Sequence, residues 1–341
     1  MYRLLLPLLV LLVACTPEST DEPTVSFDRE AMLEHWADNI IVPAFQDFRQ
    51  AARQLDGSIE TYLDAPSATT LGEVREQFAR TYLRWQRLGP FMVGPGTELR
   101  LREQVNTYPT DTERLLGGDR TDLSLPSNTD VQGLPALDFL LFGTDNPLDH
   151  AGKLRQLTAR LLELAEASTD AWTGGYRDTY VTNSGNSATA SIDRTVNNYV
   201  QWYERNLRAG KVGIPAGVFA NRPLPDLVEA PYHGELSKRL FLEALDGATD
   251  FFSADPGLAT YLDALDVKRD GEALSARIKS QFAAVRTQAA PLAEDFARQV
   301  RDDNTAMLEL YDALQRNVIL LKVDMLQALS INVDYVDADG D

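Results

Sequence analysis

Apolar residues recur at steps of three or four along most of this chain, which is the spacing of an amphipathic helix. The two clearest stripes lie near the end of the chain, from Leu274 to Val300 and from Met307 to Leu329. Stripes of this kind are typical of antiparallel helices that share a core. No segment alternates apolar and polar positions convincingly enough to indicate a strand. The pattern therefore predicts an all-α protein.

The same periodicity predicts further helices upstream. Pro43 lies inside the first of them and should kink or split it, and Pro291 should bend the helix that contains it. The residues Thr70–Glu73 form a capping-box pattern, which predicts the start of the second helix, and Gly89-Pro90 predicts its end. The expected helices cover residues 27–55, 70–88, 148–172, 188–207 and 236–252.

Irregular segments separate these helices. Residues 173–187 are rich in Gly, Thr, Asn and Ser and are either the best boundary between two halves or an inserted loop. A chain of 341 residues also favours two domains. We therefore predict two packed helical-bundle domains with long irregular connecting loops. The N-terminal domain would cover residues 27–172 and the C-terminal domain residues 173–341.

The first residues are typical of an exported protein. Arg3 precedes the short apolar run Leu4–Val13, and Ala14 then stands before Cys15. This order predicts a secretory signal peptide over residues 1–14. The apolar run is shorter than the roughly 20 residues that a membrane-spanning helix needs.

The end of this signal resembles a bacterial lipobox, Leu12-Val13-Ala14-Cys15. The resemblance implies cleavage before Cys15 and attachment of lipid to its sulfur, and Thr16 then favours the outer membrane, facing the periplasm. The alternative is an ordinary signal peptide with a chance cysteine. Residues 15–26 are rich in Pro, Thr and acids and are interpreted as a tether.

Charge and composition exclude several classes of function. The chain has 51 acidic and 32 basic residues and a net charge of −19, which argues against nucleic acid as a partner. Cys15 is the single cysteine, so an intramolecular disulfide is impossible. The three histidines are far apart, and no HExxH motif, Gly-rich phosphate loop or Gly-x-Ser-x-Gly elbow occurs. A site of carboxylate and tyrosine oxygens for a hard cation remains open.

Three segments carry polar side chains where a binding site is plausible. Asp138 lies in the most apolar run of the mature chain, Gly133–Gly143, and a carboxylate there is costly to bury unless it is paired. It is either a cap or salt-bridge partner, or part of a binding site. The other two segments, around residues 106–111 and 229–233, are irregular loops, and such loops often carry function. The candidate ligand-binding residues are Asn106, Tyr108, Asp111, Asp138, Glu229, Tyr232 and His233.

Four segments together resemble the imelysin family of bacterial envelope proteins. They are Trp85–Pro90, Val105–Asp111, Gly133–Gly143 and Lys322–Leu329. The third resembles the family signature, Gly-x-His-x-x-Glu followed by an aromatic residue and Leu-Leu. The resemblance implies an all-helical, two-domain fold with the signature near an interdomain cleft. It also implies expression linked to iron and a place in iron or haem acquisition, and the family is classed by name as a peptidase.

The chain departs from that signature at two positions. Pro135 stands where the family has His, and Asp138 stands where it has Glu. Proline can neither ligate a metal nor transfer a proton, and Pro135 instead fits the first turn of a helix. Asp138 is therefore interpreted as a binding or structural acid, and no catalytic residue is predicted. His233 is a candidate replacement for the missing imidazole.

Three hypotheses follow. The favoured one is a non-enzymatic, lipid-anchored periplasmic protein that binds a ligand, iron or haem, in the interdomain cleft and works with iron or haem uptake components. The second is an imelysin-type metallopeptidase, which needs a metal, an activated water and a base. The third is a helical scaffold for another envelope protein, in which Asp138 pairs with a buried base such as Lys322.

Overall fold

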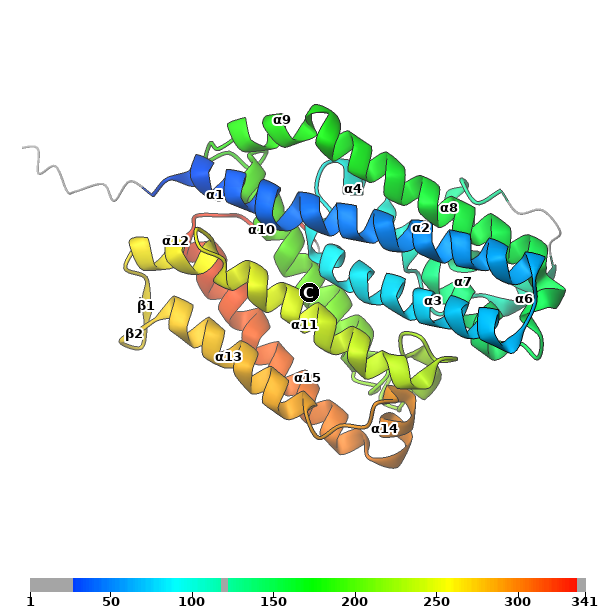
Figure 1. The fold of residues 1–341 in the computed structure, drawn as a ribbon. Helices are drawn as coiled ribbons and strands as arrows, with labels where there is room; N and C mark the ends of the chain where they lie inside the picture. The colour runs from blue at the N-terminus through cyan, green and yellow to red at the C-terminus, as the bar shows by residue number, and fades with distance from the viewer. Residues whose placement is uncertain (1–26, 118–121, 336–341) are drawn as a thin grey trace, which may run out of the picture.

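The computed structural model describes residues 27–117 and 122–335. Within those ranges the chain is mainly helical with almost no strand, so the all-α prediction is confirmed (Figure 1). The one small hairpin in this part of the chain pairs β1 (Lys268–Arg269) with antiparallel β2 (Glu272–Ala273). The predicted signal peptide (residues 1–14), Cys15 and the tether (residues 15–26) lie outside the described residues.

A long helical rod forms one edge of the molecule. It consists of α1 (Arg29–Trp36), a π-helical turn over Ala37–Ile41, and α2 (Val42–Asp64). Pro43 is the second residue of α2 and follows the π-helical turn directly, and Ile41 and Val42 before it keep helical dihedral angles. The predicted split at Pro43 is therefore wrong: the helix continues past the proline, with the π-helical turn next to it.

Helix α3 (Ala68–Leu88) returns alongside α2 and begins earlier than the sequence predicts. Its N-cap is Ser67, whose hydroxyl accepts the backbone N–H of Thr70 at 3.1 Å, while the Ser67 N–H donates to the Thr70 hydroxyl at 3.1 Å. The predicted start at Thr70 is wrong because a threonine can be either partner of a capping box. Helix α8 (Ala151–Ala171) packs against the other side of α2.

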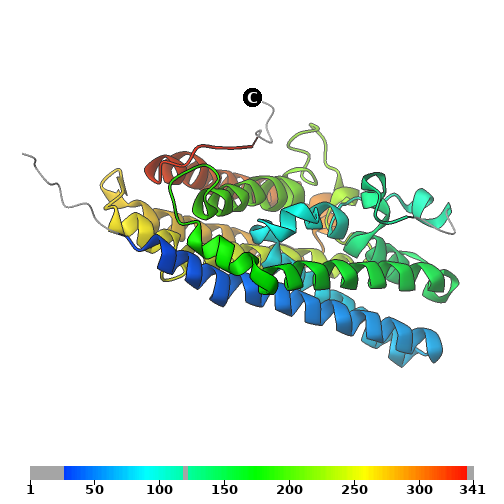
Figure 2. The same ribbon diagram turned by 90° about the horizontal axis from the view of Figure 1, so that it is seen from above.

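The second half of the chain supplies a further set of long helices. Helix α11 (Ser237–Ser253) packs on α3, and α13 (Leu274–Ala289) packs on α11 and α15 (Asn304–Val318). Helix α10 (Ser191–Trp202) continues as an 11-residue π-helical segment, Tyr203–Gly213, which also lies against α15. Seen from above, the long helices run side by side in roughly one direction (Figure 2).

Short elements connect these helices, and two predictions about the connections are wrong. Residues 173–187 are partly helical, because a π-helical turn (Trp172–Tyr176) and α9 (Arg177–Thr182) extend α8. Pro291 does not bend a helix, since α13 already ends at Ala289. The domain division at residues 172 and 173 stays a prediction. The remaining helices are α4 (Pro95–Glu98), α5 (Leu101–Val105), α6 (Thr112–Gly117), α7 (Gly133–Asp138), α12 (Leu258–Ala264), α14 (Phe296–Asp302) and α16 (Leu326–Ala328).

One continuous apolar core joins the two sets of helices. Phe251 of α11 lies at its centre, with ring centroids 4.7 Å from Trp36, 5.0 Å from Phe91 and 5.1 Å from Tyr199. Burial of each such aromatic side chain contributes on the order of 2–3 kcal/mol to the free energy of unfolding.

None of the helices in the described ranges has the length and apolar content to cross a membrane.

Candidate functional site

The Gly133–Gly143 run folds as α7 followed by a π-helical turn over Phe139–Gly143. Gly133 has φ +74°, and a Cβ there would lie 2.2 Å from the carbonyl oxygen of Val105. A glycine is therefore needed for α7 to begin against the end of α5. Pro135 is the third residue of α7, so its missing N–H falls within the first turn, where no helical partner exists.

Asp138 ends α7 and is completely buried. Its Oδ2 accepts the backbone N–H of Tyr232 at 3.0 Å, and its Oδ1 accepts the backbone N–H of His233 at 3.1 Å. Burial raises the pKa of Asp138 to about 7, against the lowering effect of these two donors. The carboxylate therefore joins α7 to the loop before α11. Lys322 is not its partner, because that ammonium contacts Glu204 at 3.0 Å.

A second buried carboxylate, Glu229, lies at the centre of a larger polar cluster. Its Oε1 accepts hydrogen bonds from the side-chain amides of Asn106 at 2.7 Å and Gln86 at 3.1 Å. Its Oε2 forms an ion pair with the ammonium of Lys211. The hydroxyl of Tyr82 donates to Asn106 Oδ1 at 2.6 Å. We call these five residues the Glu229 centre. It joins four segments that are far apart in the sequence.

The charges of the Glu229 centre are almost fully removed from water. Glu229 is 3% exposed and Lys211 is 4% exposed. Burial lowers the pKa of Lys211, and the negative charge of Glu229 acts in the opposite direction. Because a lone buried charge is very costly, the two groups depend on each other.

A cavity of about 10 Å³ lies beside the Glu229 centre, which is room for about one water molecule. The hydroxyl of Tyr108 has no hydrogen-bond partner among the described residues, and a Cβ on Gly210 would lie 3.0 Å from it. Burial, and then the charge of Glu229, raise the pKa of Tyr108 well above its usual value. Nε of Arg102 also lacks a partner within this part of the protein. The cavity is lined by Trp85, Gln86, Arg102, Asn106, Tyr108, Trp202, Asn206 and Lys211.

The structure thus divides the predicted site residues into three groups. Asn106, Tyr108 and Glu229 come together at the Glu229 centre. Tyr232 and His233 meet Asp138 through their backbone, and their rings lie against Phe139 and Phe142 at centroid distances of 5.0 and 4.4 Å. Asp111 belongs to neither group, since it caps α6 by accepting the backbone N–H of Arg114 at 3.0 Å.

Sequence reasoning missed Lys211, Gln86 and Tyr82. Lys211 is the only lysine between Lys153 and Lys238, but its neighbours in the sequence do not indicate a partner. Gln86 and Tyr82 lie on the amphipathic stripe of α3 or next to it, where periodicity identifies only the buried face.

The π-helical segment Tyr203–Gly213 also carries a second buried charge cluster. Glu204 is 1% exposed and contacts Arg208 at 3.5 Å, Lys322 at 3.0 Å and the Tyr335 hydroxyl at 3.2 Å. Long π-helical segments are rare and often occur at functional sites.

Among residues 27–117 and 122–335, no group of three or more His, Cys, Asp or Glu side chains is placed to hold a metal.

Comparison with solved structures identifies the class of fold. An imelysin-like protein from Psychrobacter arcticum superposes with a TM-score of 0.75 and 18% identity over 90% of this chain and 97% of that one. A protein assigned as an iron-regulated protein A precursor, from Parabacteroides distasonis, superposes with a TM-score of 0.74 and 11% identity over 88% and 95% of the two chains. The fold is therefore imelysin-like.

Comparison of sequences identifies the family. The imelysin family (peptidase M75) matches residues 41–321. The chain belongs to the imelysin family, as its resemblance to the signature predicted. Iron-regulated protein A of Synechococcus elongatus is 24% identical over 115 residues, which is 34% of this chain and 32% of that protein. This chain thus aligns with about a third of that relative's length.

Proposed function

We propose that this protein is an exported iron-binding protein without peptidase activity, and that it takes an iron ion at the Glu229 centre. The observation that carries the proposal is the Lys211–Glu229 ion pair beside a water-sized cavity. The ammonium of Lys211 neutralises the carboxylate of Glu229, and a bound metal cation would neutralise the same carboxylate in its place.

A hard cation would need the ammonium of Lys211, which lines the cavity together with Arg102, to move away. Glu229 does not itself line the cavity and would then supply carboxylate oxygens, and Tyr108, which does line it, supplies a phenol oxygen without a partner in the described structure. The side-chain amides of Asn106 and Gln86 donate to Glu229 through nitrogen. Rotation of either amide by about 180° would direct its oxygen toward the bound ion instead. Hard cations prefer such oxygen donors. The small cavity favours a bare ion over haem.

The relatives supply the link to iron. Two of them are named as iron-regulated protein A or its precursor. The proposal extends this link to the present chain and adds the location that its first residues predict. Residues 1–14 would direct export, and lipid on Cys15 would hold the protein on the outer membrane, facing the periplasm. Iron uptake components of the envelope would then be its partners.

Titration of the whole chain with ferric and ferrous iron tests this proposal. Heat and visible absorbance are recorded, because a tyrosinate bound to ferric iron gives a visible charge-transfer band. We expect Glu229→Gln to abolish binding and Tyr108→Phe to abolish the band. Asp111→Asn is the matched control, because Asp111 caps α6 away from the centre. Equal binding by the native chain and Glu229→Gln would refute the site.

A casein-cleavage assay tests the remaining alternative. If the native chain cleaves casein, a chelator stops the cleavage and Glu229→Gln lacks it, the protein is a metallopeptidase with its active site at the same centre, and the iron-binding proposal is wrong. Iron binding without cleavage in either chain supports the proposal. The scaffold alternative predicts that the native chain neither cleaves casein nor binds iron. It also predicts that the native chain and Glu229→Gln bind the same envelope protein.

A further inference from the structure

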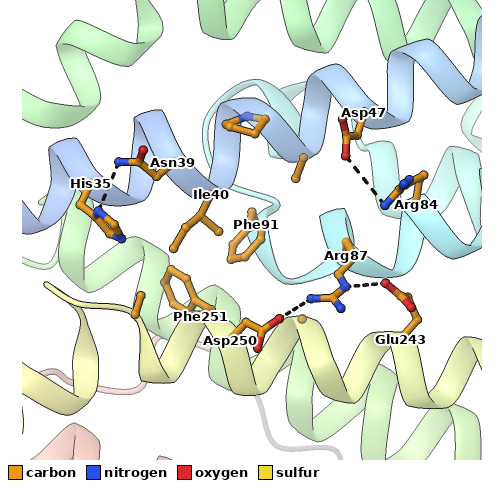
Figure 3. A pocket seen from close by; sticks show the side chains of 14 residues that line it. His35, Asn39, Ile40, Asp47, Arg84, Arg87, Phe91, Glu243, Asp250 and Phe251 are labelled. Carbon is orange, nitrogen blue, oxygen red and sulfur yellow. Dashed lines mark hydrogen bonds and ion pairs between the residues drawn. The ribbon is translucent and has the colours of Figure 1, made fainter.

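A separate groove lies on the opposite side of α3, between this helix, the α1–α2 rod and α11 (Figure 3). Its volume is about 480 Å³, which is within the usual range for small-molecule sites. It shares no lining residue with the cavity beside the Glu229 centre. A second hollow of about 400 Å³ continues it and shares Asp47, Arg84 and Glu243.

The floor of the groove is apolar. Phe91 and Phe251 close it from below and are 2% and 0% exposed. The half-buried Ile40, Pro43 and Ala44 form the wall on the side of the α1–α2 rod. A ligand with a short apolar body would therefore cover surface that water now contacts.

The polar end of the groove is organised around Arg87. Its Nε donates to Glu243 at 2.5 Å and its Nη1 donates to Asp250 at 2.5 Å (Figure 3). Both acids lie on one face of α11, so a single guanidinium fixes two carboxylates. The second oxygen of each, Glu243 Oε2 and Asp250 Oδ1, accepts no hydrogen bond from the described residues.

The charge of this end is negative. Arg84 contacts Asp47 only at 3.9 Å, so this pair contributes no net charge. Arg87 neutralises one of its two carboxylates, which leaves one net negative charge at the polar end of the groove. The whole chain also carries −19, which attracts cations and repels anions.

We propose that this groove binds a small organic cation, namely a primary ammonium on a short aromatic or aliphatic body. The ammonium would donate to the free oxygens of Glu243 and Asp250, and the body would lie on Ile40, Pro43 and Ala44. Charge-assisted hydrogen bonds of this kind are stronger than neutral ones. The site is independent of the proposed iron site, because the two share no residue.

Calorimetry with 2-phenylethylammonium and the whole chain tests this inference, and phenylacetate is the anionic counterpart of the probe. We expect the cation to bind with a dissociation constant on the order of millimolar or tighter, and the anion to bind at least tenfold more weakly. Glu243→Gln should weaken binding of the cation about fivefold to tenfold. Asp250→Asn should weaken it less, by about twofold to fivefold, because the Asp250 side chain is 69% exposed. Asp302→Asn, at an exposed ion pair on α14, should leave it unchanged.

A variant that fills the groove keeps the test decisive if the acid variants unfold. Ala44→Phe adds a ring to the wall without touching the Arg87 contacts, and it should abolish binding in a chain whose circular dichroism is native. Equal binding of phenylacetate, or unchanged binding in folded Ala44→Phe, would overturn the inference. Glu229→Gln should leave binding of the ammonium intact, which separates this result from the fate of the iron site.

Discussion

The carboxylate of Asp138 at the end of α7 accepts the backbone N–H of Tyr232 at 3.0 Å, although 94 residues separate the two in the sequence. The neighbouring N–H of His233 donates to the other oxygen of the same carboxylate at 3.1 Å. The acid of the signature therefore holds the loop that also supplies Glu229. Since Tyr232 lies three residues beyond Glu229 in the same loop, this contact holds the backbone next to the Glu229 centre.

The pH dependence of folding should report this contact. Burial raises the pKa of Asp138 from 3.8 to about 7, so the native state keeps a proton that the unfolded chain loses. The contribution of this group to the free energy of unfolding is therefore fully present below about pH 4 and is lost as the pH rises to about 7. The loss is at most about 4 kcal/mol. Urea denaturation at pH 5 and pH 8 measures most of this loss.

The variant Asp138→Asn should remove this pH dependence, because an amide does not titrate in that range. Its free energy of unfolding should change less between pH 5 and pH 8 than that of the native chain. Asp111→Asn is the control and should keep the native slope, since Asp111 caps α6 elsewhere. A native slope in Asp138→Asn would assign the pH dependence to other groups.

Removing the ammonium from the Glu229 centre should destabilise the protein strongly. Lys211→Met leaves Glu229 buried without its cation, and the expected loss is about 3–5 kcal/mol in the free energy of unfolding. Arg298→Met is the control, because its ion pair with Asp302 is exposed and contributes less than about 1 kcal/mol. Urea denaturation of both variants gives the comparison.

The same variant connects stability with the proposed ligand. If iron takes the place of the ammonium, adding iron should raise the melting temperature of Lys211→Met more than that of the native chain. The reason is that a ligand bound only to the folded state stabilises it by mass action. Equal shifts in the two chains would show that iron does not compete with Lys211.

The sequence allowed the helices to be predicted because burial follows the helical period. The stripes from Leu274 and from Met307 correspond to α13 to α16. The exact start of a helix and the type of helix were harder to predict. Ser67 and Thr70 can both cap a helix, and the π-helical segment Tyr203–Gly213 has no distinct pattern.

The candidate site was predictable only in part. Asn106 and Glu229 both lie in irregular loops, which made them candidates, but their contact joins positions 123 residues apart. Lys211 was missed because a single lysine between a glycine and a valine shows no spacing that indicates a partner. Asp111 was included for its residue type, and its capping role became visible only with the start of α6.

The start of α7 should not tolerate a side chain at Gly133. Gly133→Ala places a Cβ 2.2 Å from the Val105 carbonyl oxygen and keeps φ at +74°. Both the backbone clash and the positive φ are costly, so we expect a loss of about 3 kcal/mol or more. Gly152→Ala is the matched control. A Cβ on Gly152, within α8, meets nothing within 4 Å, and the change should stabilise the protein by about 0.5–1 kcal/mol. Similar melting temperatures for the two variants would contradict this role of Gly133.

Tyr108 offers the clearest separation of stability from function. Its hydroxyl makes no hydrogen bond within the described structure, so Tyr108→Phe removes an oxygen without leaving a partner unsatisfied. We expect the free energy of unfolding to change by less than about 1 kcal/mol, while the visible band with ferric iron disappears. Tyr82→Phe is the matched control for loss of a phenol, because its hydroxyl donates to Asn106 at 2.6 Å and its removal should cost about 1–2 kcal/mol. A loss above about 2 kcal/mol in Tyr108→Phe would mean that the oxygen serves folding rather than a ligand.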